Sequence, residues 1–155
     1  MSVHIVFYSK SGRTKLVAKT IQTFLNATLE ELIDHKKRSG IWGFLTAIFD
    51  ARFKKLTVIS QVQYNPGNFE LVVIGTPIWA GMPAPAVRTY LIQYASQIDK
   101  IAFFCTHGSS SPENVFKELE RIAGKVPIAT LAISSKDFKT NKLLEKVKNF
   151  VEALK

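Results

Sequence analysis

The chain has 155 residues, of which 46% are hydrophobic, and this composition fits one globular domain over residues 1–155 rather than a disordered chain. Its longest apolar run, residues 41–49, is too short to span a bilayer, and no basic region precedes the apolar N-terminal stretch. A single cysteine excludes an internal disulfide framework and a cysteine-rich metal site. We therefore expect a cytoplasmic protein with no transmembrane segment and no signal peptide.

The formal net charge of +9 favours anionic partners, whether acidic proteins, small anionic ligands, nucleic acid or anionic lipid. The basic residues are spread along the chain, with local clusters at residues 36–38 and 52–55. Such a spread is more typical of a solvated surface than of a nucleic-acid groove. We therefore expect no nucleic-acid partner.

The N-terminal part of the chain predicts a strand, a helix and a second strand. Val3–Tyr8 is nearly continuously apolar, which is typical of a strand buried on both faces of a parallel sheet. Apolar residues at helical spacing then predict a helix that starts near Arg13. Leu29–Asp34 is a weaker strand candidate.

Residues 36–68 are the least regular part of the chain. Ile41–Phe53 predicts a helix with a broad apolar face, which we expect to cover the sheet. The alternative is a peripheral contact with a membrane surface through residues 36–55. Thr57–Gln63 is predicted to be extended along the surface.

The C-terminal part predicts three more strands, each followed by a helix. The apolar runs that predict the strands are Leu71–Gly75, Ile101–Cys105 and Ile128–Ile133. Helical patterns follow at residues 87–94, 115–122 and 143–154, and Ser111 is the expected N-cap of the second, with Pro112 in its first turn. This alternation predicts an α/β fold of βαβ units with right-handed crossovers.

Three loops follow predicted strands at the edge of the sheet where ligands bind in such folds. In the first, Ser9, Ser11, Gly12 and Thr14 precede a helix, so hydroxyl groups and backbone N–H groups gather as donors for a phosphate. The alternative is an ordinary capped helix start. No P-loop or Rossmann glycine motif follows the first strand, and the first carboxylate in the chain is Glu30, which argues against a receiver domain.

Taken together, the three loops resemble those of the flavodoxin family. Ser9–Thr14 fits that family's phosphate loop, Gly75–Pro83 resembles its first flavin-flanking loop, and Cys105–Ser111 stands where its second flavin loop stands. The resemblance covers nearly the whole chain. It implies a flavodoxin-like three-layer sandwich with a five-stranded parallel sheet in the order 2-1-3-4-5.

The resemblance also implies FMN as the cofactor. Trp79 offers a flat face to the isoalloxazine ring, although a core position is the alternative, and Thr76 offers a hydrogen bond to the ribityl chain or the ring edge. The Ala80–Gly81 peptide offers a carbonyl to the flavin N5. The expected cofactor-binding residues are Ser9, Lys10, Ser11, Gly12, Arg13, Thr14, Thr76, Pro77, Ile78, Trp79, Ala80, Gly81, Thr106, His107, Gly108 and Ser109. No catalytic side chain and no metal ligand is expected, and Cys105 is expected to be a small buried residue.

Carboxylates are scarce around these loops, whereas Lys10, Arg13 and Arg88 are close in sequence. Well-known flavodoxins are acidic there, so the sequence argues against an acidic carrier that docks onto basic reductases. The leading hypothesis is an FMN-binding redox protein. It is either an electron carrier for a redox partner protein or a small oxidoreductase that uses NAD(P)H or reduces an acceptor such as a quinone. The alternative is a cofactor-free interaction module that binds an anionic partner through its basic surface.

Overall fold

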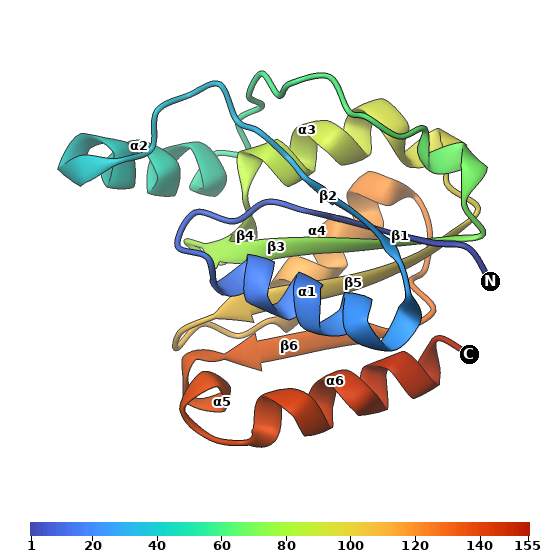
Figure 1. Ribbon diagram of the computed structural model, residues 1–155. Helices are drawn as coiled ribbons and strands as arrows, with labels where there is room; N and C mark the ends of the chain where they lie inside the picture. The colour runs from blue at the N-terminus through green and yellow to red at the C-terminus, as the bar shows by residue number, and fades with distance from the viewer.

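The computed structural model describes residues 1–155 and contains five parallel strands in the order β2-β1-β3-β5-β6 (Figure 1). The parallel strands are β1 (Val3–Phe7), β2 (Thr28–Glu31), β3 (Leu71–Trp79), β5 (Lys100–His107) and β6 (Thr130–Ser134). A two-residue strand, β4 (Met82–Pro83), pairs with the end of β3 in the antiparallel direction. The predicted α/β class and strand order are both confirmed, because β5 and β6 are the fourth and fifth parallel strands.

Helices cover both faces of the sheet. The longer helices are α1 (Arg13–Leu25), α2 (Gly40–Arg52), α3 (Pro85–Tyr94), α4 (Glu113–Ala123) and α6 (Lys142–Ala153). Shorter turns are α5 (Ser135–Lys139), η1 (Pro66–Asn68) and η2 (Ala95–Gln97). Helices α1 and α6 pack side by side on one face of the sheet, and α3 and α4 pack on the other (Figure 1).

Two hydrophobic cores lie on either side of the sheet. Ile5 and Phe7 of β1 pack into the core under α1 and α6, whereas Val6 packs into the core under α3 and α4. Since alternate residues of a strand point to opposite faces, a strand that is buried on both faces must be apolar throughout. This explains why the strand sequences are continuous rather than alternating.

The structure differs from two local predictions. Strand β3 continues past Gly75 to Trp79, because its last residues pair with β5 and β4 instead of forming an open loop. The N-cap of α4 is Pro112 rather than Ser111, whose hydroxyl donates to the carboxylate of Glu113 and caps no backbone N–H group.

The predicted helix is present as α2 and is followed by the predicted extended stretch, but α2 does not cover the sheet as expected. The helix lies beyond the carboxyl end of the sheet (Figure 1), and its large apolar residues face outward. The chain after it is extended, as predicted, and forms an antiparallel bridge between Ile59 and Asp34 beside the edge strand β2. None of the helices has the length and apolar character needed to cross a membrane.

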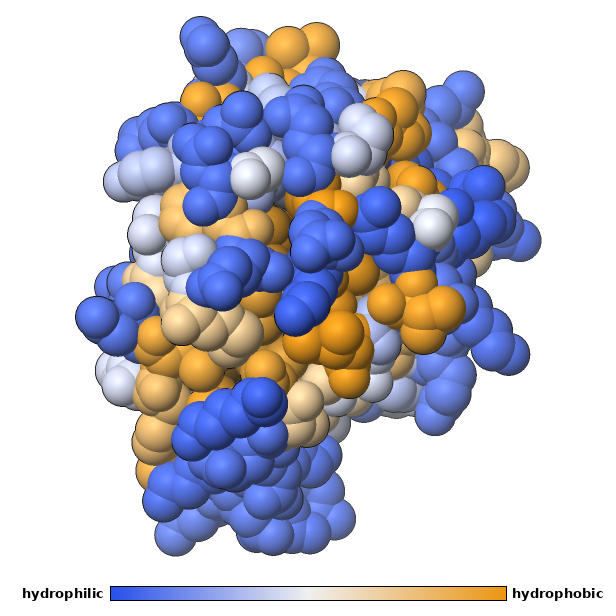
Figure 2. Space-filling view, turned by 90° about the vertical axis from the view of Figure 1, so that its right-hand side faces the viewer, coloured by the Kyte–Doolittle hydropathy of each residue, from blue (hydrophilic) through white to orange (hydrophobic).

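The opposite end of the molecule, where the strands begin, faces the viewer in Figure 2. Apolar side chains on that end are interrupted by hydrophilic ones. Scattered apolar residues of this kind are usual on protein surfaces.

Candidate functional site

The three loops with expected binding residues meet at one edge of the sheet. They follow β1, β3 and β5, which are neighbours in the sheet, and all parallel strands end at this edge (Figure 1). The chain leaves β1 for one face and β3 for the other, which is the switch in strand order where open α/β sheets bind ligands. The tertiary structure thus brings together segments separated by almost 100 residues of sequence.

The first loop is shaped as an anion cradle. Gly12 has a φ of 95°, a backbone conformation that favours glycine, and adding a Cβ there would meet no other atom within 4 Å. The hydroxyl oxygen of Ser9 accepts hydrogen bonds from the backbone N–H groups of Gly12, at 3.1 Å, and Lys15, at 3.2 Å. The N–H groups of Ser11, Arg13 and Thr14 have no acceptor within the protein. Free donors at the positive end of α1 are suited to a phosphate.

Two contacts fix this loop against the rest of the site. The Thr14 and Thr106 hydroxyls lie 2.8 Å apart and are buried, so the first loop is tied to the end of β5. The Arg13 guanidinium donates to the Ser135 hydroxyl at 2.9 Å. Thr14 therefore positions the loop, whereas Ser11 stays exposed at its tip.

The second loop is a tight hairpin between β3 and β4. Ala80 and Gly81 both have positive φ angles, of 49° and 77°, which is the backbone of a type I′ turn. The side chain of Thr76 is fully buried; its hydroxyl donates to the carbonyl of Pro77 and accepts from the N–H of Ala84. The Thr76 hydroxyl thus holds the hairpin in this structure.

Trp79 is half-buried and held from two sides. The ring of Tyr8 approaches it edge-on, with ring centroids 5.5 Å apart, and the guanidinium of Arg38 lies 5.8 Å from its centroid. Arg38 is itself buried and bonded to two aspartates, Asp34 and Asp50. Trp79 therefore packs partly against the core under α3 and α4 and leaves the rest of its ring exposed at the site.

Two adjoining hollows run across the loops and share Ser11 and Pro77. One, of about 150 Å³, is lined by Ser11, Arg13, Pro77, Ile78, Thr106, His107 and Gly108. The other, of about 200 Å³, is lined by Lys10, Ser11, Phe44, Ala47, Ile48, Pro77 and Trp79. Together they place polar donors at one end and aromatic and aliphatic groups at the other, which is the distribution that a ligand with a phosphate and a flat ring requires.

Sequence reasoning missed the contribution of α2 to the second hollow. Phe44, Ala47 and Ile48 come from this helix, which was expected to cover the sheet. The signal available was the pair of small residues Gly43 and Ala47, which lie one turn apart and allow the helix to approach its neighbours closely.

The remaining expected residues occupy the rim. Ser109 and Gly108 are exposed, and His107 keeps its ring beside the loop, 3.1 Å from the Gly108 carbonyl. Cys105 is fully buried, and burial raises the pKa of its thiol to about 12. A thiol with this pKa is not ionised at neutral pH, so the expectation of a small buried residue is confirmed.

Arg88 does not contribute a free cation to the site. It is buried and donates to the carboxylate of Glu118 at 2.6 Å, which also accepts from Arg121. The hydrogen bonds from Arg121 and Arg88 lower the pKa of Glu118 to about 2. The basic residues that border the loops without an acidic partner are Lys10 and Arg13.

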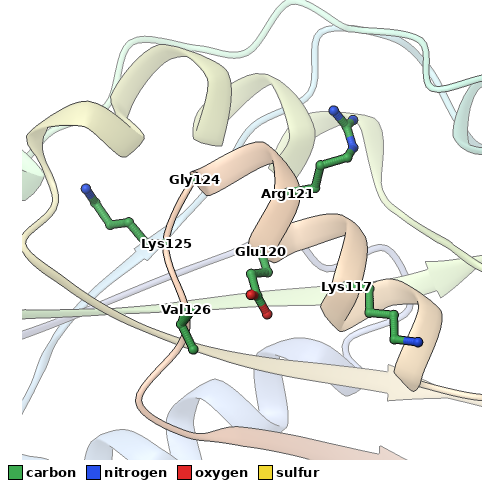
Figure 3. A pocket seen from close by; sticks show the side chains of 6 residues that line it. All are labelled: Lys117, Glu120, Arg121, Gly124, Lys125 and Val126. Atoms are coloured by element: carbon green, nitrogen blue, oxygen red, sulfur yellow. The ribbon is translucent and has the colours of Figure 1, made fainter.

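A larger hollow, of about 530 Å³, lies away from these loops at the carboxyl end of α4 (Figure 3). It is lined by Lys117, Glu120, Arg121, Gly124, Lys125 and Val126. The side chains drawn in Figure 3 point in different directions rather than toward one centre. We assign this open hollow no ligand.

The fold agrees with that of solved flavoprotein structures. A Lactobacillus acidophilus flavoprotein, solved in complex with FMN, superimposes with a TM-score of 0.68 at 21% identity, covering 92% of this chain and 97% of that one. The fold is flavodoxin-like. Flavodoxin 2 of Bacillus cereus has a TM-score of 0.60 at 17% identity, covering 99% of this chain and 97% of its own.

A third structure, the two-electron reduced flavodoxin of Megasphaera elsdenii, also has a TM-score of 0.60, at 16% identity, and covers 97% of this chain and 98% of its own. No protein-family description matches the sequence, and no curated protein matches it either. At these identities the likeness concerns the flavodoxin-like fold over nearly the full chain, and the ligand must be argued from the site.

Proposed function

We propose that this protein binds FMN and takes part in redox reactions. The observation that supports this most is the first loop, where free N–H donors and a left-handed glycine stand beside a two-part hollow bordered by Trp79. A phosphate needs the donors, and a flat aromatic ring needs the second hollow. The structural neighbour solved with FMN adds support from a protein of the same fold.

The residues divide the binding task between them. The free N–H groups of Ser11, Arg13 and Thr14 would hold the phosphate together with the Ser11 hydroxyl and the Arg13 charge. The Thr14 and Thr106 hydroxyls keep this loop in register with β5. Trp79 would contact the ring, and backbone groups of residues 107–109 would meet its polar edge. Bound FMN supplies one- and two-electron transfer, and the protein supplies orientation and electrostatics.

The electron acceptor is either a redox partner protein or a small molecule such as a quinone. Steady-state oxidation of NAD(P)H with a soluble quinone separates the two, because an oxidoreductase turns over alone and a carrier does so only when a reductase is added.

The test of FMN binding is a charge placed in the phosphate loop. Gly12→Asp puts a carboxylate against the phosphate, and each lost charge-assisted hydrogen bond costs ~1.5–3 kcal/mol. We expect calorimetry to show FMN affinity reduced by about two orders of magnitude and riboflavin affinity nearly unchanged, because riboflavin has no phosphate. FAD should bind more weakly than FMN to the unmodified protein, since no second cradle is present for an adenosine half.

The matched control is Gly124→Asp. Gly124 also has a positive φ, of 65°, and open space at its Cβ, but it lies at the end of α4. Gly124→Asp therefore introduces the same kind of backbone strain but places its charge away from the phosphate loop. Equal losses of FMN and riboflavin affinity in Gly12→Asp would contradict the loop assignment, and no flavin binding at all would favour the cofactor-free interaction module.

A further inference from the structure

Helix α2 carries an exposed apolar surface that the fold does not use. We call it the docking face and define it by Ile41, Trp42, Phe44, Leu45, Phe49 and Phe53. Ile41 is 78% exposed and Trp42 is 83% exposed. A contiguous group of large exposed apolar residues marks a contact with another surface, whereas single ones do not.

The buried side of α2, by contrast, consists mainly of small residues. The helix buries the small residues Gly43, Ala47 and Ala51, together with Asp50. A Cβ on Gly43 would overlap the backbone of Arg38, so the helix and the preceding chain touch at this point. Packing onto the protein thus needs only the small residues, and it does not account for the large ones that face away.

The exposed helix is firmly attached. The Arg38 side chain, which is buried, donates from Nε to Asp34 at 2.7 Å and from Nη1 to Asp50 of α2 at 3.0 Å. The Thr57 hydroxyl donates to the same Asp34 at 2.6 Å, which ties down the chain on the other side of the helix. The docking face is therefore held in place before any partner arrives.

Cations surround the docking face. Lys10 lies 5.7 Å from the ring centroid of Phe44, and Lys37, Arg52 and Lys55 are exposed at the two ends of α2 with no acidic partner. Between residues 36 and 56 the one acid is Asp50, whose carboxylate is buried against Arg38 and Lys36. The surface thus has an apolar centre and a positive rim.

This combination fits an anionic bilayer better than a second copy of the chain. A two-fold contact would place the same cations opposite each other, where they repel. Anionic headgroups attract them, while a tryptophan and aliphatic side chains enter the boundary between headgroups and acyl chains. We propose that the docking face of α2 binds the surface of membranes that contain anionic lipid.

The docking face adjoins the candidate site. Phe44 belongs to the docking face and also lines the hollow that contains Trp79. Docking thus turns this hollow toward the lipid. This orientation favours an electron acceptor dissolved in the bilayer, such as a quinone, an inference that rests on the proposed function. The docking itself needs no flavin.

Cosedimentation with vesicles tests the proposal on flavin-free protein. We expect binding to vesicles of phosphatidylglycerol and phosphatidylcholine, weakening as salt is added, and about tenfold or more weaker binding to pure phosphatidylcholine. The Ile41→Ser, Phe49→Ser double variant should lose about tenfold or more of the affinity for the anionic vesicles. The matched control is Val126→Ser, which removes an apolar residue that is 76% exposed at the other end of the molecule and should bind as the unmodified protein does.

A second readout locates the contact. In Trp79→Phe, Trp42 is the one remaining tryptophan, and brominated lipid should quench its fluorescence. Three outcomes would overturn the proposal: no binding to anionic vesicles, equal loss of binding in Val126→Ser and the double variant, or a lipid-free dimer that dissociates in the double variant. FMN binding is measured independently of vesicle binding, by calorimetry. A protein that binds vesicles but not FMN would contradict only the proposed function, and one that binds FMN but not vesicles would contradict only the docking.

Discussion

At the scale of single residues, Gly75 shows how closely β3 and β5 approach. The two strands pair with Gly75 opposite Phe104, and a Cβ at Gly75 would overlap the fully buried Phe104 ring. Its φ is not positive, so the requirement for glycine here is one of space rather than of backbone conformation. The ring fills the volume that the missing side chain leaves.

Gly75→Ala should therefore destabilise the protein by about 3 kcal/mol, because an overpacked core must shift its side chains or backbone. Urea unfolding measures the change, and Gly108→Ala is the control, since a Cβ there meets nothing within 4 Å. Adding Phe104→Leu to Gly75→Ala should recover part of the loss. Equal stability of the two alanine variants would show that the ring moves freely.

At the scale of secondary-structure elements, an ion pair joins α3 to α4. Arg88 of α3 and Glu118 of α4 are both buried, and Arg121 bonds to the same carboxylate from the protein surface. The pKa of Glu118 is lowered to about 2, from about 4.5 in an unfolded chain. A carboxylate with a lowered pKa contributes stability above the unfolded pKa, and that contribution is lost as the pH falls toward the folded one.

We expect the free energy of unfolding to fall by about 2 kcal/mol from this group between pH 5 and pH 2, less than the full shift implies because Arg121 is solvated. Glu118→Gln should flatten this part of the pH dependence. It should also cost about 3 kcal/mol at pH 6, because Arg88 is left buried without its partner. Glu120→Gln, on the same helix but in no ion pair, is the control, and an unchanged pH dependence in Glu118→Gln would contradict the assignment.

At the scale of the whole molecule, the net charge of +9 sets the electrostatic environment of the site. Lys10 and Arg13 border the loops without an acidic partner, and Arg88 is neutralised by Glu118. Fully reduced FMN is an anion, so neighbouring cations favour it and neighbouring carboxylates disfavour it. If the proposed FMN binding holds, we expect the second one-electron reduction potential of the flavin to be higher than in acidic flavodoxins.

Lys10→Gln should lower this potential by the equivalent of ~1 kcal/mol per electron. A unit charge about 4 Å away contributes ~4 kcal/mol, and a longer distance and salt both reduce this contribution. Spectroelectrochemical titration measures the shift. Lys148→Gln, an exposed change on α6 away from the site, should leave the potential as it was. A very low second potential in the unmodified protein would instead support the low-potential electron carrier.

The residue patterns of the sequence determined the α/β class and the three loops that follow strands, whereas the strand order was expected from the resemblance to flavodoxins. Strands that are buried on both faces must be apolar throughout, and a glycine and hydroxyl groups ahead of a helix serve an anion, so both features are written in local residue patterns. For the same reason the burial of Cys105 was predictable from its place in a continuous apolar run.

Only the tertiary structure decided where side chains with two possible roles point. Thr76 turns into its own hairpin, Arg88 pairs with an acid on another helix, and α2 turns its large apolar residues away from the sheet. Each outcome depends on a partner that periodicity does not identify: Ala84 for Thr76, Glu118 for Arg88, and Asp50 for the Arg38 link that fixes α2. Periodicity shows that a helix has an apolar face, but which face packs inward is set by the size of the residues that must fit against the neighbouring chain.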